Sequence, residues 1–179
     1  MATSFRPLER SDFPRLSEWL ATPHVAAWWR HQHDPASVEA DFGPIVDGED
    51  TTEGFVVEED GRAIGLIQRY RLDDEGDWDR TVAVGSAPRP AAGIDYLLGD
   101  ESRVGQGLGP RVIDAFVVAT WEGYPDLVAI VVAVQQANRR SWRALEKAGF
   151  RRDWSGILES DDPSDAGPSH VYVRLRALG

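Results

Sequence analysis

Residues 103–113 read RVGQGLGPRVI, with glycines at positions 105, 107 and 109 directly before an apolar run. Glycines in front of a helix let backbone N–H groups approach an anion closely, and the helix N terminus adds roughly half a positive charge. The segment therefore predicts a phosphate-binding loop that leads into a helix. Its spacing matches neither the G-x-G-x-x-G of dinucleotide-binding folds nor a Gly-Lys-Ser/Thr triphosphate loop, and a tight turn without a ligand remains the alternative.

Strands and helices are predicted to alternate around this loop. A strand at 93–98 precedes it, and the next helix takes its buried face from Val112, Ile113, Phe116, Val117 and Trp121. An apolar strand at 127–134 follows, and then come a helix at 138–148 and strands at 150–157 and 170–176. This order predicts an α/β fold around a mixed sheet.

The N-terminal half adds a strand at 3–7, a helix with Phe13, Leu16, Trp19 and Leu20 on one face, and a second helix from Pro23 that carries Trp28 and Trp29. Asp34 and Pro35 predict the start of a third, short helix, and residues 43–51 a connection. Asp60 and Gly61 predict a hairpin between strands at 54–59 and 62–70, whereas 72–92 predicts a long loop or the irregular end of a hairpin. We find no repeat or second domain and expect one domain, 1–179.

Composition limits the classes of function. The chain has no cysteine, which excludes disulfides and thiolate chemistry. A membrane-spanning helix needs about 20 consecutive apolar residues, and no apolar run in the chain approaches this length. A cytoplasmic protein without membrane partners is therefore expected. The net charge of -11 disfavours nucleic acid and favours a cationic partner. Monomer and homodimer both remain open.

A second motif, Asn138 followed by a helix that ends in Glu146-Lys147-Ala148-Gly149-Phe150, stands downstream of the glycine loop. Together the two motifs resemble the GNAT family of N-acetyltransferases. The resemblance implies the GNAT fold, with a largely antiparallel twisted sheet flanked by helices, and acetyl-CoA as cofactor. It implies these cofactor-binding residues: Leu97, Arg103, Val104, Gly105, Gln106, Gly107, Leu108, Gly109, Pro110, Asn138 and Arg143. Two positions depart from the family pattern, because Val104 replaces the usual Arg or Gln and Leu145 replaces a frequent tyrosine.

Within the family, the chain is similar to the aminoglycoside 6'-N-acetyltransferases and to the lysine N-acyltransferases of siderophore synthesis. The similarity rests on Pro23-His24-Val25-x-x-Trp28-Trp29, Gly65-x-x-Gln68-x-Tyr70, Trp78, Gly93-Ile94-Asp95-x-Leu97-Leu98 and Val171-Tyr172-Val173. At the position where the aminoglycoside enzymes carry a further acidic residue, this chain has Ala133, so it lacks that acid. The resemblance predicts acetyl transfer to the 6'-amine of an aminoglycoside, with acylation of a siderophore-type lysine as the alternative.

An aminoglycoside is a polycation, and the acids at 73, 74, 75, 77 and 79 surround Trp78, which offers a flat stacking surface. For the acids, the alternative is a solvated acidic surface without a ligand. For Trp28 and Trp29, the alternative is that one of them packs in the core, since adjacent helix positions point about 100° apart and both cannot face the same core. The predicted substrate-binding residues are Trp28, Trp29, Gln68, Tyr70, Asp74, Glu75, Asp77, Trp78 and Asp95.

Acetyl transfer needs a neutral amine, so a base must take a proton from the ammonium substrate. Asp95 is the predicted base, and Tyr172 the predicted donor of a proton to the departing thiolate. His31 and His33 lack a third ligand nearby in sequence, so no metal is expected. A catalytically silent module that keeps the fold and binds a cation is the alternative from another class.

Overall fold

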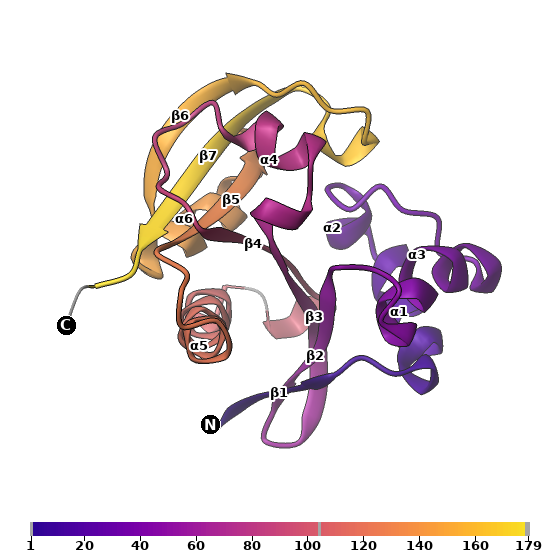
Figure 1. The fold of residues 1–179 in the computed structure, drawn as a ribbon. Coiled ribbons are helices and arrows are strands. Elements are labelled where there is room, and N and C mark those ends of the chain that lie inside the picture. Colours follow the sequence, from indigo (N-terminus) through magenta and orange to yellow (C-terminus); the bar gives the residue numbers. More distant parts are fainter. Residues whose placement is uncertain (1, 104, 178–179) are drawn as a thin grey trace. The chain divides into compact units, whose positions relative to one another are not determined.

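The computed structural model describes residues 2–103 and 105–177. In these ranges the chain has a mixed α/β fold whose seven strands form a sheet in the order β1-β2-β3-β4-β5-β7-β6 (Figure 1). The β1–β2, β2–β3, β5–β7 and β6–β7 pairs are antiparallel, whereas β4 and β5 are parallel. The predicted fold class is thus confirmed. The residues group into two compact units, and the expected single domain stays a prediction.

The first unit contains the described residues up to Arg69 together with Asp95–Gln106. Its elements are β1 (Thr3–Pro7), η1 (Arg10–Asp12), α1 (Phe13–Ala21), α2 (Pro23–Ala26), α3 (Pro35–Asp47), β2 (Glu53–Glu59), most of β3 (Arg62–Arg71), the end of β4 (Ala91–Leu98) and η3 (Glu101–Arg103). The four apolar residues predicted for α1 are all buried. The predicted hairpin is confirmed, with φ of 49° at Asp60 and 78° at Gly61.

Two predictions for this unit were wrong. Helix α3 is not short, because it continues through Gly43 and Pro44 and ends only at Gly48, whose φ of 71° is left-handed. Its apolar residues Phe42 and Val46 pack in the core of the unit, which compensates for the hydrogen bond that Pro44 cannot make. Helix α2 ends at Ala26, so Trp28 and Trp29 lie beyond it.

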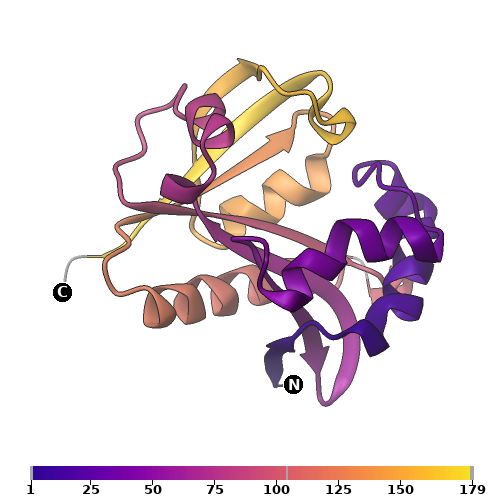
Figure 2. The same cartoon turned by 45° about the vertical axis from the view of Figure 1, so that its right-hand side comes forward.

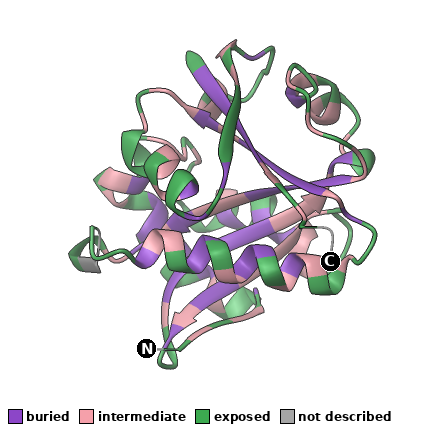
Figure 3. Cartoon of the chain, turned by 90° about the vertical axis from the view of Figure 1, so that its left-hand side faces the viewer, coloured by how far each residue is buried: buried purple, intermediate pink, exposed green. Residues whose placement is uncertain are grey.

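The second unit contains Tyr70–Ile94 and the described residues from Gly107 onward. Its elements are η2 (Leu72–Asp74), α4 (Asp77–Val82), the start of β4, α5 (Leu108–Gly123), β5 (Ala129–Gln135), α6 (Arg139–Lys147), β6 (Arg151–Ile157), η4 (Pro163–Asp165) and β7 (Pro168–Leu175). Strands β5, β7 and β6 lie side by side, and α6 lies along one face of them (Figures 1 and 2). Helix α5 buries one stripe of residues and leaves another exposed (Figure 3). Four of the five residues predicted for the buried face are buried, whereas Trp121 is only partly buried.

The segment 72–92 is not a long loop, the first of the two structures that its sequence indicated, because it contains η2 and α4 between the neighbouring strands β3 and β4. Leu72 and Val82 are buried in the core cluster of the second unit, and α4 forms between them. Strand β4 begins at Ala91, two residues before the predicted start. Leu72 and Val82 are ten positions apart, so these two buried residues are too few to produce a helical pattern in the sequence, which explains the error.

Candidate functional site

The glycines of the quoted segment leave the start of α5 uncovered by side chains. Gly107 is the N-cap of α5 with a left-handed φ of 75°, and no side chain caps the helix there among the described residues. Gly105 has a φ of 86°, and a Cβ added at either glycine would meet nothing within 4 Å. The first helical residues are Leu108, which is buried, and Gly109, which is partly exposed, and the open space at the glycines before them fits a phosphorylated cofactor at this helix start.

Other predicted cofactor residues lie in both units. Asn138 is the N-cap of α6, where its Oδ1 accepts a hydrogen bond from the Ser141 N–H at 3.2 Å. The Arg143 guanidinium is exposed and lies 5.6 Å from the centre of the Trp142 ring. In the first unit, Gln106 Nε2 donates to the carbonyl of Ser102 at 2.9 Å.

Four predicted cofactor residues remain, of which Leu97 and Pro110 are restricted as contacts. The Leu97 side chain is buried in the core of the first unit, so only its backbone remains for a ligand. Arg103 ends the short helix η3, and Val104 lies outside the described residues. Pro110 has no N–H to donate, and it occupies the third position of α5.

Tyr70 and Trp78, two predicted substrate residues, pack together in the second unit. Trp78 Nε1 donates a hydrogen bond to Tyr70 Oη at 3.1 Å, and both rings lie against the core cluster of the unit. The Tyr70 ring occupies the space that a Cβ would need at Gly93. Gly93 is therefore required by the position of this ring, and both aromatic side chains are held in defined places.

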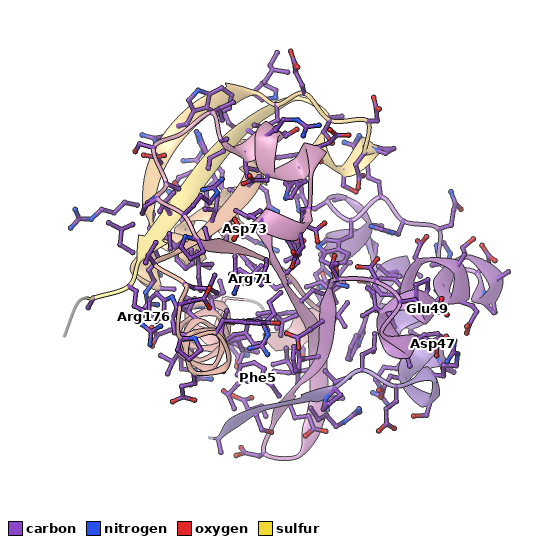
Figure 4. The ribbon with its side chains drawn as sticks, in the orientation of Figure 1. Phe5, Asp47, Glu49, Arg71, Asp73 and Arg176 are labelled. Atoms are coloured by element: carbon purple, nitrogen blue, oxygen red, sulfur yellow. The ribbon has the colours of Figure 1, made fainter. Side chains whose placement is uncertain are left out.

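The acids near Trp78 are partly neutralised, which the sequence analysis did not foresee. Asp73 lies 3.6 Å from Arg71, which also pairs with Asp126 at 2.6 Å, and Arg71 and Asp73 stand beside each other in Figure 4. Asp79 pairs with Arg89 at 2.6 Å, and Asp77 pairs with Arg80. Arg71 holds the pKa of Asp126 below its usual value. The arginines at 71, 80 and 89 were visible in the sequence, but their partners were not.

The first unit holds four further predicted residues. Trp29 packs against the core cluster, and its ring centre lies 5.7 Å from that of His31, which bonds to Asp41. Trp28 is partly buried, as is Asp95 on β4, and Gln68 is buried on β3. Trp29 thus packs against the core, which agrees with the alternative for one of the two tryptophans, but neither lies on the helix from which that alternative was argued.

Tyr172 is fully buried on β7, and its hydroxyl donates a hydrogen bond to Glu146 Oε1 at 2.9 Å. Burial, followed by this hydrogen bond, raises the pKa of Tyr172 to about 12. The phenol therefore keeps its proton over the whole ordinary pH range. Its predicted role as a proton donor stays a prediction, and Glu146 is a partner that the sequence analysis did not identify.

His24 and His170 have structural partners. His24 Nε2 is 2.8 Å from the carbonyl oxygen of Leu98, and His170 Nδ1 is 2.7 Å from Ser155 Oγ. Burial and the charge of Arg152 lower the pKa of His170. Across the described ranges, no group of three or more His, Asp or Glu side chains could hold a metal ion. No helix in the described part of the chain is long and apolar enough to cross a bilayer.

Comparison with known proteins gives one family. A family model for the acetyltransferase (GNAT) domain matches residues 9–155. Aminoglycoside N(6')-acetyltransferase type 1 of Klebsiella pneumoniae is 28% identical over 180 residues, covering 98% of this chain and 84% of that protein. Lysine N-acyltransferase MbtK of Mycobacterium tuberculosis is 26% identical over 155 residues, covering 82% and 67%.

Solved structures agree with these relatives. Aminoglycoside acetyltransferase AAC(6')-Ib in complex with coenzyme A and kanamycin has a TM-score of 0.81 and 28% identity, over 98% of this chain and 95% of that one. Its complex with ribostamycin and coenzyme A has a TM-score of 0.82 and 27% identity, over 98% and 94%. These matches confirm the resemblance predicted from the glycine loop and the Asn138 motif.

Proposed function

Because the chain belongs to the acetyltransferase (GNAT) domain family, we propose that it transfers the acetyl group of acetyl-CoA to the 6'-amine of an aminoglycoside. The observation that carries the proposal is the 28% identity to an aminoglycoside N(6')-acetyltransferase over 98% of this chain. The similarity thus includes the N-terminal unit and the acidic segment. The activity fits antibiotic resistance.

The start of α5 suits the cofactor. The amides of Leu108 and Gly109 lie at the positive end of the α5 dipole, where no described side chain competes for them. Oxygens of a pyrophosphate would accept from these amides, and the neighbouring glycines keep the approach open. When bound, acetyl-CoA supplies the thioester that the amine attacks.

The chain's own side chains would prepare the amine. An ammonium group cannot attack a carbonyl until it loses a proton, and Asp95 is the proposed acceptor of that proton. Trp78 offers a stacking face, and Asp74, Glu75 and Asp77 offer negative charge to a polycation. Tyr172 is the proposed source of the proton that returns to the thiolate, although its raised pKa makes it a weaker acid than a thiol.

A thiol-release assay with acetyl-CoA tests the reaction. We expect coenzyme A release with kanamycin and ribostamycin, and mass spectrometry of the product should place one acetyl group on the 6'-amine. Release with lysine derivatives alone, and better with longer acyl chains, would instead support a siderophore-type acyltransferase, which the similarity to MbtK favours as second candidate. Binding of an amine without any thiol release would support a catalytically silent module.

We further propose that the protein acts in the cytoplasm as a monomer or homodimer, without nucleic acid or membrane partners. The net charge of -11 supports the absence of a nucleic-acid partner, because the protein would repel phosphodiester backbones. Sedimentation analysis at assay concentrations measures the oligomeric state directly.

A further inference from the structure

Asp153 on β6 holds the connection that follows α4. Its Oδ2 accepts a hydrogen bond from the Ser86 N–H at 2.5 Å, and its Oδ1 accepts one from the Ser86 hydroxyl at 2.6 Å. Both carboxylate oxygens therefore bind one residue of a segment 67 positions away in sequence. Hydrogen bonds to an ionised acceptor are about twice as strong as neutral ones, so this contact is a specific anchor.

Gly85 provides the space for this anchor. A Cβ added at Gly85 would overlap the Asp153 carboxylate, and no other group lies as near to that position. The backbone of Gly85 is not in the left-handed region, so its conformation suits any residue. The glycine is thus required for the approach of Asp153 and not for the turn.

A β-bulge directs Asp153 toward this connection. In the β6–β7 register Arg152 pairs with Tyr172 and Trp154 pairs with Val171, so Asp153 is the extra residue on β6. A bulge interrupts the alternation of a strand and changes the direction of a side chain, and such bulges are frequent beside active sites. The bulge at Asp153, the space at Gly85 and the two donors of Ser86 therefore all contribute to the contact between Asp153 and Ser86.

The anchored connection lies directly after the helix that carries Trp78. In this connection Arg89 pairs with Asp79 of α4, and Ala87 packs against the core cluster. Thr81, which lies in α4 itself, donates from its Oγ1 to the carbonyl of Glu159 at 2.9 Å. Helix α4 is thereby held at Asp79 and Thr81. We propose that Asp153 is a positioning residue for the amine substrate, which acts by fixing α4 and its acidic and aromatic side chains; this rests on the function proposed above.

Two variants break the anchor in different ways. Asp153→Asn removes the charge, and Gly85→Ala keeps the charge but displaces the carboxylate. For both, we expect the KM for kanamycin to rise about tenfold, because small misplacements of substrate-binding groups are costly, while kcat and the KM for acetyl-CoA stay within about twofold. Ser86→Ala keeps the N–H bond, so its effect should be smaller.

Asp161→Asn is the matched control, since Asp161 is exposed in the same unit and the substitution changes the net charge equally. Amide exchange at residues 83–88 should accelerate in Asp153→Asn and stay unchanged in the control. An unchanged KM for kanamycin in both anchor variants would overturn the proposal, as would unchanged exchange. If the wild-type protein releases no thiol with any aminoglycoside, the proposed function fails and the positioning role fails with it, whereas the exchange data still decide whether the anchor exists.

Discussion

The start of α5 and the segment around α4 are both proposed ligand sites, yet they are built in opposite ways. At α5 the proposed ligand contacts are backbone amides next to Gly107, and the glycines matter because they have no side chain that would occupy the space before the helix. Around α4 the proposed contacts are side chains; Trp78 is held by the Tyr70 hydroxyl, and the connection after α4 is held by Asp153. A backbone site can be recognised in a short stretch of sequence, whereas a side-chain site needs the tertiary structure.

The largest expected effect comes from closing the backbone site. Gly107→Val places a branched residue at a φ of 75° and a side chain where phosphates would approach. If two charge-assisted hydrogen bonds are lost, each worth about 1.5–3 kcal/mol, acetyl-CoA affinity should fall on the order of 10³-fold by calorimetry.

Gly48→Val is the matched control, because Gly48 also has a left-handed φ, 71°, at the end of α3 and also has open space around it. It should lose comparable stability and keep its affinity for acetyl-CoA. Equal affinity losses in both variants would mean that strain, and not the loop, explains the effect.

The second prediction concerns Asp95, which belongs to neither region and tests whether chemistry can be separated from binding. Asp95→Asn keeps the shape and removes the charge. As the proposed base, it should lower kcat by roughly 10²-fold or more while acetyl-CoA binding survives. A normal kcat with a raised KM for the amine would identify Asp95 as a binding residue only.

Much of the fold could be predicted from the sequence, because local signals and tertiary packing agree. The Asp60-Gly61 turn, the Asp34 cap and the apolar stripe of α5 each lie within a few residues of the element they define. The continuation of α3 through Pro44 could not be predicted, since packing of its last turn overrides a residue that usually ends helices.

The candidate site shows the same division. The glycine loop was identified from local spacing and Asn138 from the family resemblance; Gly105 and Gly107 are left-handed and Asn138 caps α6, while their binding of a cofactor stays a prediction. The pairing of Asp79 with Arg89 and the anchor at Asp153 are contacts between side chains whose geometry has no pattern in sequence. The sequence showed the acids near Trp78, but not that Asp73, Asp77 and Asp79 pair with arginines.

The third prediction uses the buried hydroxyl of Tyr172. Burial and, after it, the hydrogen bond to Glu146 raise the folded-state pKa of Tyr172 from the usual 10.0 to about 12, so the stability linked to the protonated phenol is fully present below pH 10 and is lost as pH rises through 12. The thermal unfolding temperature should therefore fall more steeply between these pH values in the wild type than in Tyr172→Phe. In the same variant, a kcat lower by about tenfold would support the proton-donor role, and an unchanged kcat would limit Tyr172 to packing.

The smallest expected effect comes from the acidic side chains around α4, and it tests the side-chain site as a source of charge. Neutralising Asp74, Glu75 and Asp77 together should raise the KM for kanamycin about threefold to tenfold with kcat nearly unchanged, because steering affects encounter and not the chemical step. The effect is modest because Asp77 already pairs with Arg80, and such exposed pairs contribute at most about 1 kcal/mol.

A matched triple variant separates local from overall charge. Glu18→Gln, Glu49→Gln and Asp161→Asn change the net charge by the same amount at exposed, dispersed positions. If the acids around α4 bind the amine, only the first triple variant should raise KM, and added salt should weaken kanamycin binding more in the wild type than in that variant. Equal changes in both triples would mean that the overall field of the acidic protein attracts the cation. In that case Trp78 and its hydrogen bond to Tyr70, and not the neighbouring carboxylates, would give the segment its selectivity.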